Sequence, residues 1–151
     1  MRDKDMWNKI INNNDLKDFM ESVDFFHDSC IKELRYSSGA YVDEDLSMYP
    51  INERRILNVI IQRQSEDNST IEMEFEGLKC LKLFPVDDSY TCEIFDSTMI
   101  LKEDCIYWCD CGGLSVTDLE DYSGTMICAS KLRWRSINNH MGEKEFFVSI
   151  Q

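Results

Sequence analysis

Proline and glycine are scarce in this chain, with two prolines and six glycines among 151 residues. Disordered and low-complexity chains are usually enriched in both, so this scarcity argues against those classes. The chain also lacks an internal repeat, and its length is that of one domain. Its hydrophobic content of 43% is enough for one sizeable core. We therefore expect a single domain over residues 1–151.

Long apolar segments are absent as well. The longest purely aliphatic run is Val59-Ile60-Ile61, which is far too short to cross a bilayer. The polar start of the chain, with "NKIINNND" after residue 7, has no signal-peptide core. Seven cysteines, an odd number, without an export signal are interpreted as reduced thiols. We therefore expect a cytoplasmic protein without a membrane partner.

Positive charge is in deficit. The net charge is -13, a field that repels nucleic acid and anionic membrane surfaces and would steer a basic protein partner. Simple solubility is the alternative explanation. Three loops concentrate the acidity, and if the strands bring them to one end of a sheet they form an acidic rim. The candidate partner-binding residues are Asp43, Glu44, Asp45, Asp87, Asp88, Asp118, Glu120 and Asp121.

Sequence motifs of known enzyme classes are missing, and only two histidines are present. His27-Asp28-Ser29 is the first candidate for a chemical site, but neighbours on an extended strand point to opposite faces, so His27 and Asp28 are not expected to pair. We interpret the segment as a junction between a helix and a sheet, with Phe25 or Phe26 packed beneath and Asp28 or Ser29 holding the turn. No catalytic residue is assigned, and a non-enzymatic protein is favoured.

A cysteine cluster offers a second candidate. Strand alternation would put Cys105, Cys109 and Cys111 on one face. A structural zinc site needs four ligands, usually as two short-spaced pairs, and no C-x2-C pair occurs in the chain. We therefore assign no metal and no cofactor. A small-molecule or metal-binding module on the concave face of the sheet remains the alternative function.

Apolar and polar residues alternate with period two along much of the chain after residue 28. The clearest case is 70–85, where Ile71, Met73 and Phe75 alternate with glutamates, and Gly77 predicts a bend or bulge. Strands are expected over residues 30–37, 54–64, 70–85, 93–102, 105–110, 125–137 and 143–150.

Residues 3–22 have helical spacing instead. Apolar residues between Met6 and Ile11 predict one or two helical turns, and Asp15 is expected to cap a short second helix. The tight connection at 102–104 predicts a hairpin. No strand–helix–strand alternation occurs, which argues against a parallel sheet. We predict an α+β fold: a six- to seven-stranded, mostly antiparallel, curved sheet (a roll or open barrel) with an N-terminal helical segment packed on it.

Three cations occupy alternate positions of one expected strand, at Lys131, Arg133 and Arg135. We expect them to pair across strands with an acidic face rather than to bind nucleic acid, because the net charge opposes the latter. That acidic face consists of Glu72, Glu74 and Glu76.

The order of several segments resembles a family of small uncharacterised bacterial proteins of the Firmicutes type, over residues 25–136. The segments are "FHDSCIKEL", "SSGAYVDEDLSM", "ILNVIIQRQ", "IEMEFEGLKCLKLFP", "IFDSTMILKEDCIYWCD" and "ASKLRWR". A looser similarity, through the F-H-D-S element and the acidic character, is to immunity proteins of bacterial polymorphic toxin systems. That similarity implies a non-enzymatic inhibitor that neutralises a basic toxin. Exposed sheet edges leave both a monomer and a homodimer open.

Overall fold

The computed structural model describes residues 6–148. Its strands are β1 (Asn8–Ile10), β2 (Ser29–Ser37), β3 (Tyr41–Val42), β4 (Met48–Tyr49), β5 (Ile56–Arg63), β6 (Thr70–Lys82), β7 (Thr98–Lys102), β8 (Cys105–Cys109) and β9 (Met126–Ser136). Its helices are α1 (Asn13–Ser22), the short 3-10 helix η2 (Asp24–Phe26) and α2 (Val116–Glu120).

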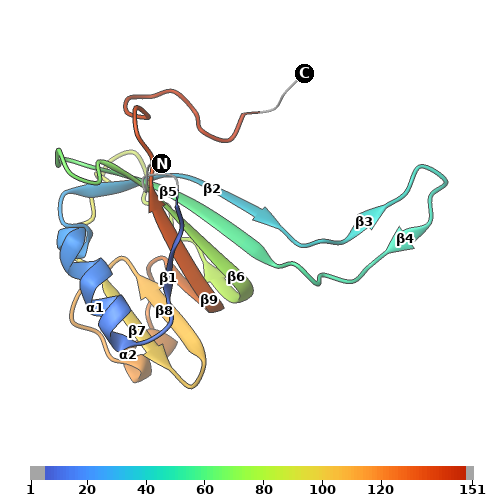
Figure 1. The fold of residues 1–151 in the computed structure, drawn as a ribbon, viewed down its shortest axis with the longest axis horizontal. Helices are drawn as coiled ribbons and strands as arrows, with labels where there is room; N and C mark the ends of the chain where they lie inside the picture. The colour runs from blue at the N-terminus through green and yellow to red at the C-terminus, as the bar shows by residue number, and fades with distance from the viewer. Residues whose placement is uncertain (1–5, 149–151) are drawn as a thin grey trace.

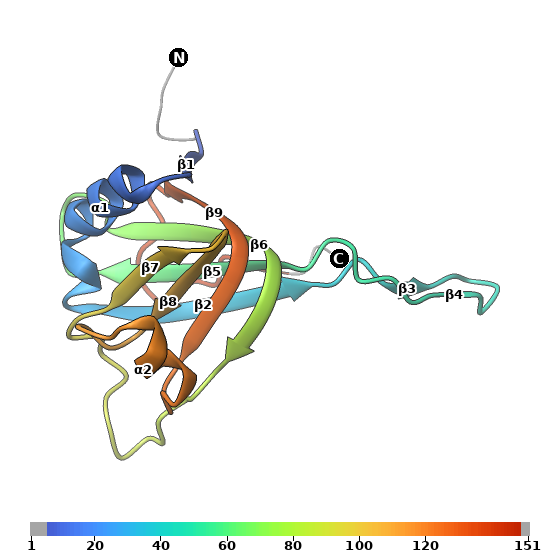
Figure 2. The ribbon, with the colours of Figure 1, turned by 90° about the horizontal axis from the view of Figure 1, so that it is seen from below.

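Seven strands form one antiparallel sheet in the order β2-β5-β6-β9-β8-β7, with β1 paired to the C-terminal part of β9. The sheet is strongly curved but, within residues 6–148, is not closed into a barrel (Figure 2). The predicted α+β class is therefore confirmed. β3 and β4 form a separate two-stranded sheet that projects from the body (Figure 1).

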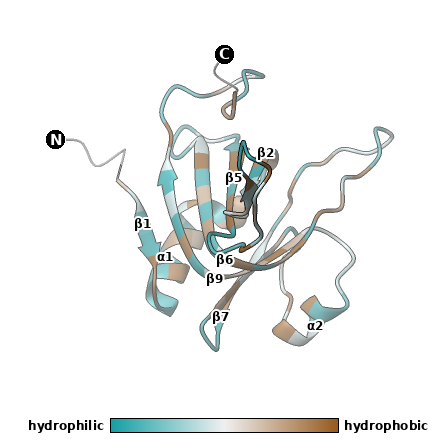
Figure 3. Cartoon of the chain, turned by 90° about the vertical axis from the view of Figure 1, so that its right-hand side faces the viewer, coloured by the Kyte–Doolittle hydropathy of each residue, from teal (hydrophilic) through white to brown (hydrophobic). Residues whose placement is uncertain are grey.

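One face of the sheet carries the main core. Because side chains of a strand alternate between faces, Ile71, Met73 and Phe75 of β6 all point to this face, and each is fully buried. Figure 3 shows the resulting alternation of hydrophobic and hydrophilic residues along the strands. α1 and η2 cover this face with Phe19 and Phe26, whose rings meet edge to face at 5.7 Å between centroids.

The opposite face carries the predicted charge pairs between β6 and β9. Their register sets Glu72 opposite Arg135 and Glu74 opposite Arg133. The Arg135 guanidinium lies 2.8 Å from the Glu72 carboxylate, and the Arg133 guanidinium lies 2.7 Å from that of Glu74. Asn58 of β5 donates to both carboxylates, at 2.9 and 3.1 Å. Arg133 and Arg135 are therefore paired with carboxylates within the sheet.

The start of the chain departs from the prediction. Residues 8–10 form β1 instead of helical turns, because the edge of β9 offers a ladder to an asparagine-rich segment of weak helix propensity. Ile10 is buried against the core while Ile11 is 71% exposed. Residues 3–5 of the expected helical segment lie outside the described residues. The cap of α1 is Asn12, whose side chain accepts from the backbone N–H of Asp15.

Two predicted strands also differ. Residues 93–97 are outside β7, because Ile94 instead forms a single bridge with Ser29 of β2. The expected final strand is wrong for residues 143–148, where the backbone N–H groups of Phe146 and Phe147 donate to the Glu33 carboxylate rather than to a neighbouring strand. Residues 149–150 of that strand lie outside the described residues.

The predicted bend in the third long strand is confirmed. β6 runs through Gly77 to Lys82, and its register with β9 shifts between Leu78 and Cys80. Gly77 has a φ of +66°, and a Cβ there would lie 3.0 Å from the side chain of Ser130. Glycine therefore permits both the left-handed conformation and the close approach of β9.

Replacing Glu72 by alanine should lower the free energy of unfolding by about 2–3 kcal/mol. The substitution removes the acceptor of Arg135 and of Asn58 at a position where the Glu72 side chain is only 4% exposed. Glu76 makes a 3.8 Å contact with Lys131 at a side chain that is 53% exposed, so Glu76→Ala should cost less than about 0.5 kcal/mol. Urea unfolding of both variants measures the difference. Equal losses would contradict this account of the sheet.

Candidate functional site

A β-hairpin arm, residues 38–55, extends beyond the main sheet between β2 and β5 (Figures 1 and 2). β3 and β4 pair within it, with Tyr41 opposite Tyr49 and Val42 opposite Met48. The rings of Tyr41 and Tyr49 stack, with centroids 4.8 Å apart and planes 17° apart. The arm thus has a defined strand register although it lies outside the main sheet.

The arm is apolar and exposed at the same time. Its exposed hydrophobic side chains are Tyr41, Val42, Leu46, Met48, Tyr49 and Ile51, and Leu46 is 83% exposed. An isolated two-stranded hairpin is only marginally stable in water. Grouped exposed apolar side chains mark interaction sites on proteins. The arm is therefore the strongest candidate for a binding site in the described residues.

Acidic residues form the tip of the arm. The turn that joins β3 to β4 contains Asp43, Glu44 and Asp45, and it is closed by hydrogen bonds between Asp43 and Ser47 (2.8 Å) and between Leu46 and Asp43 (2.8 Å). The Asp45 carboxylate accepts from the Ser47 backbone N–H at 3.0 Å. This bond, with a second from the Ser47 hydroxyl, lowers the pKa of Asp45. The tip is thus negatively charged beside an exposed leucine.

The base of the arm is anchored to the sheet. The Ser38 carbonyl accepts from the backbone N–H groups of both Arg54 and Arg55, at 3.0 and 3.2 Å. Gly39 adopts a φ of +96°, and a Cβ there would lie 3.1 Å from Arg54. The close approach of the two segments at the base of the arm therefore depends on glycine. The same junction is held to β6, because the Leu78 backbone N–H donates to the Arg55 carbonyl at 2.9 Å.

The structure does not assemble one acidic rim. α2, which contains Asp118 and Glu120, lies at the other side of the body from the arm and its acidic tip (Figures 1 and 2). Asp87 and Asp88 lie in the connection after β6, whose start is tied towards α2 by hydrogen bonds of Lys82 to the Glu120 carbonyl (3.5 Å) and of Phe84 to Thr125 (3.0 Å). Asp121 is the C-cap residue of α2.

Some of these carboxylates have local roles. Asp118 closes a capping box at the start of α2, where it accepts from the backbone N–H of Ser115 at 2.9 Å and from its hydroxyl. These bonds lower the pKa of Asp118. Asp87 accepts from the backbone N–H of Ser89 at 2.7 Å.

His27 and Asp28 are in contact, which the strand geometry was expected to prevent. The His27 Nε2 lies 3.3 Å from the Asp28 carboxylate. The expectation fails because Asp28 is not extended: its φ of +58° is left-handed and turns the carboxylate back towards the ring. The Nδ1 of His27 lies 2.7 Å from the Phe95 carbonyl. Both ring nitrogens therefore face acceptors, and neither faces a nucleophile.

The rest of this segment forms the expected junction. Phe26 is fully buried and packs on Trp108, while Phe25 is 43% exposed. The Asp28 backbone N–H donates to the Ile94 carbonyl at 3.0 Å, so Asp28 holds the turn through its main chain.

The cysteine cluster is divided by the end of β8. Cys105 and Cys109 pack with the second, smaller core under α2, whereas Cys111 follows the strand, and its carbonyl accepts from the Cys109 thiol at 3.2 Å. Residues 6–148 contain no group of three His, Cys, Asp or Glu side chains placed to hold a metal ion. Cys105 contacts the Lys79 ammonium at 2.9 Å, a pair that sequence spacing does not reveal.

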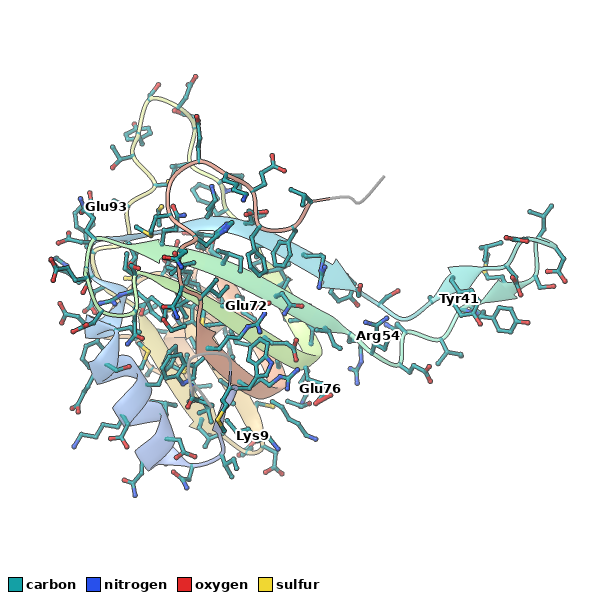
Figure 4. All side chains as sticks on the ribbon, turned by 45° about the horizontal axis from the view of Figure 1, so that its top comes forward. Lys9, Tyr41, Arg54, Glu72, Glu76 and Glu93 are labelled. Atoms are coloured by element: carbon teal, nitrogen blue, oxygen red, sulfur yellow. The ribbon has the colours of Figure 1, made fainter. Side chains whose placement is uncertain are left out.

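A groove of about 830 Å3 is the second feature that sequence reasoning missed. It forms because β9 pairs with β8 only up to Ala129 and with β1 only from Leu132. Ser130 and Lys131, which lie between these two paired stretches of β9, line the groove together with Lys9 and Ile56. Figure 4 shows two of the lining residues: Glu76 lies near Arg54 at the base of the arm, and Lys9 lies farther from the arm. Six strands contribute to the groove, so no local pattern could indicate it.

Comparisons of the chain with models of protein families, with curated proteins and with solved structures find no match. The resemblance drawn from the sequence segments therefore stays a prediction. Among the residues described, no helix combines the length and the apolar character that crossing a membrane requires.

The pKa of His27 should lie above 6.5, first because its ring donates to the Phe95 carbonyl and second because Asp28 is negatively charged. NMR titration of the two histidines, assigned with His27→Gln, measures it. Asp28→Asn should lower the pKa without removing the whole shift, because the Phe95 carbonyl remains. The contribution of this pair to stability is then complete below pH 6.5 and is lost as the pH rises through the raised pKa. A His27 pKa at or below 6.5 would contradict the geometry.

Proposed function

We propose that this chain is a non-enzymatic binding protein whose arm contacts a basic protein partner, and that it acts as an immunity-type inhibitor of a toxin in the cytoplasm. The observation that carries the proposal is the arm itself. It places six exposed apolar side chains and an acidic tip away from the body of the protein.

The apolar part of the arm supports affinity. Tyrosine is enriched among the residues that dominate binding energies, because its ring covers a large area at a low cost in conformational entropy. The stacked pair of Tyr41 and Tyr49 is already ordered in the free chain, which reduces the entropy lost on binding. Val42 and Met48 pair on the opposite face of the hairpin and Leu46 lies in its turn, so the arm offers apolar contacts on both faces.

The charge supports the choice of a basic partner. The arm tip carries three adjacent carboxylates on a chain of net charge -13. A field of this sign speeds encounter with a cationic surface and slows encounter with nucleic acid. Asp87, Asp88, Asp118, Glu120 and Asp121 add to this long-range field from other parts of the surface.

A narrow hairpin with an acidic tip suits a concave basic surface. Nucleic-acid-binding clefts of toxins are of this kind, since they are lined by cations that hold phosphates. The resemblance to immunity proteins through Phe26 to Ser29 points to the same class of partner. The His27 ring, with both nitrogens engaged by Phe95 and Asp28, supports a non-enzymatic function.

Replacing both Tyr41 and Tyr49 by alanine should weaken binding of the partner by about 2 kcal/mol or more, roughly a thirtyfold rise in Kd. The partner is sought among basic products of neighbouring genes and by affinity capture, and Kd is then measured with purified proteins. Tyr90→Ala is the matched control, because Tyr90 is also exposed (72%) but lies outside the arm. If Tyr90→Ala weakened binding as much as the arm variant, the arm would not be the site.

Neutralising the tip with Asp43→Asn, Glu44→Gln and Asp45→Asn should lower the association rate constant about tenfold at low salt and much less at high salt. The control removes the same number of charges elsewhere, with Asp88→Asn, Glu120→Gln and Asp121→Asn. Stopped-flow or surface plasmon resonance measurements of the association rate constant over a salt series distinguish the tip variant from the control. An association rate that is independent of salt in the unmodified chain would overturn the electrostatic part of the proposal.

A further inference from the structure

The groove beside β9 has an apolar floor. Ile10, Ile106 and Leu132 line it from three strands, and Ile56 and Leu101 extend it at either side. These residues come from β1, β8, β9, β5 and β7, so the floor is formed by the sheet itself and is not a surface loop. A floor of this composition suits apolar side chains of similar size.

The rim of the groove is more basic than the chain as a whole. Four of the 16 lysine and arginine residues line it: Lys9, Lys79, Lys131 and Arg133. Three carboxylates lie among them, and two of these are already paired, Glu74 with Arg133 at 2.7 Å and Glu76 with Lys131 at 3.8 Å. On a chain of net charge -13, a site where cations outnumber carboxylates favours an acidic occupant.

The groove also offers backbone hydrogen-bonding groups. Within the described chain, Ser130 and Lys131 have no ladder partner on the edge of β9 that faces the groove, because β8 ends opposite Ala129 and β1 begins opposite Leu132. Because neighbouring residues of a strand turn their N–H and C=O groups to opposite edges, this gap offers the backbone groups of one residue to an extended chain in the groove. The occupant should therefore be extended, apolar and acidic.

The arm of this chain has these three properties. β3 and β4 are extended, their side chains are apolar on both faces, and their turn is acidic. Its position is also suitable for exchange between two copies. Ile56, the first residue of β5 after the arm, lines the groove, so arm and groove lie on one continuous part of the surface (Figure 4). A two-fold dimer needs this arrangement, because each copy must present both the donor and the acceptor to its partner.

We propose that, in the absence of a toxin partner, the arm of one copy binds in the groove of a second copy, so that the chain forms a symmetric arm-exchanged dimer. The proposal rests on the proposed function, because it takes the arm to be the binding element. Exchange buries the exposed apolar side chains of both arms and makes the same contact twice. A basic partner that binds the arm would compete with the second copy and release the monomer.

Two charge-reversal variants test the contact. The groove variant carries Lys9→Glu and Lys79→Glu, and the arm variant carries Asp43→Lys and Glu44→Lys. All four side chains are exposed, so the fold should be retained, which circular dichroism and the thermal midpoint check. Sedimentation equilibrium measures the mass of each variant alone and of the two mixed, against a chain mass of 17.8 kDa.

The unmodified chain should sediment at twice the chain mass at micromolar concentration. Each variant alone should be monomeric, with a dimer Kd raised about tenfold or more, because its arm meets a groove of like charge. Mixing them should restore a dimer, since both contacts then join opposite charges. A matched control with Lys17→Glu and Lys102→Glu, exposed lysines outside the groove, should remain dimeric.

A monomeric unmodified chain, or a mixture that stays monomeric, would overturn the dimer. These outcomes are separate from the proposed function, which is read from binding of the basic partner by the Tyr41 and Tyr49 variant. If the groove variant is monomeric and still binds that partner with unchanged affinity, the arm is the shared element and the groove belongs to the dimer. If the partner instead failed to compete with a dimer that does form, the dimer would not use the arm, and the proposal would fall.

Discussion

The pairing of β6 with β9 is the interaction on which the rest of the structure depends. These are the two longest strands, and they sit at the centre of the sheet. One face of β6 carries the fully buried Ile71, Met73 and Phe75, and the other carries the carboxylates that bind the arginines of β9. Both faces of this pair therefore fix the same register, since a slip by one residue would bury glutamates in the core.

The two surface features follow from strands of unequal length around this centre. Between the end of β2 and the start of β5 the chain continues beyond the main sheet, and this segment pairs only with itself, which produces the arm. On the other side, β9 is longer than either β8 or β1, and the place where neither pairs with it becomes the groove. The proposed donor and the proposed acceptor of an extended, apolar chain thus arise from one property of the sheet.

Much of the sheet could be predicted because its determinants are local. Alternation along Ile71 to Phe75, the stripe of Lys131, Arg133 and Arg135, and the short 102–104 connection each specify a strand or a hairpin within a few residues. At that connection Glu103 and Asp104 both adopt positive φ, of 53° and 62°, as a two-residue hairpin turn requires. The β-bulge was indicated by Gly77 alone.

What could not be predicted depends on distant partners or on a single backbone angle. β1 exists because β9 has a free edge more than a hundred residues away, while its own residues favour no regular structure strongly. The His27–Asp28 contact depends on the left-handed conformation of Asp28. An aspartate can adopt this conformation, but its presence in the sequence does not predict it. The acidic loops could be identified from the sequence. The exposure of the apolar side chains beside Asp43 to Asp45 could not, because it depends on the arm projecting from the body.

Hydrogen–deuterium exchange of the chain with and without the proposed basic partner tests the central claim most directly, because it shows which backbone segments a partner covers. Exchange should slow in residues 41–51 of the arm and change little in α2 and in residues 87–88. Slower exchange at α2 or at residues 87–88, with the arm unaffected, would contradict the claim that the arm is the binding element.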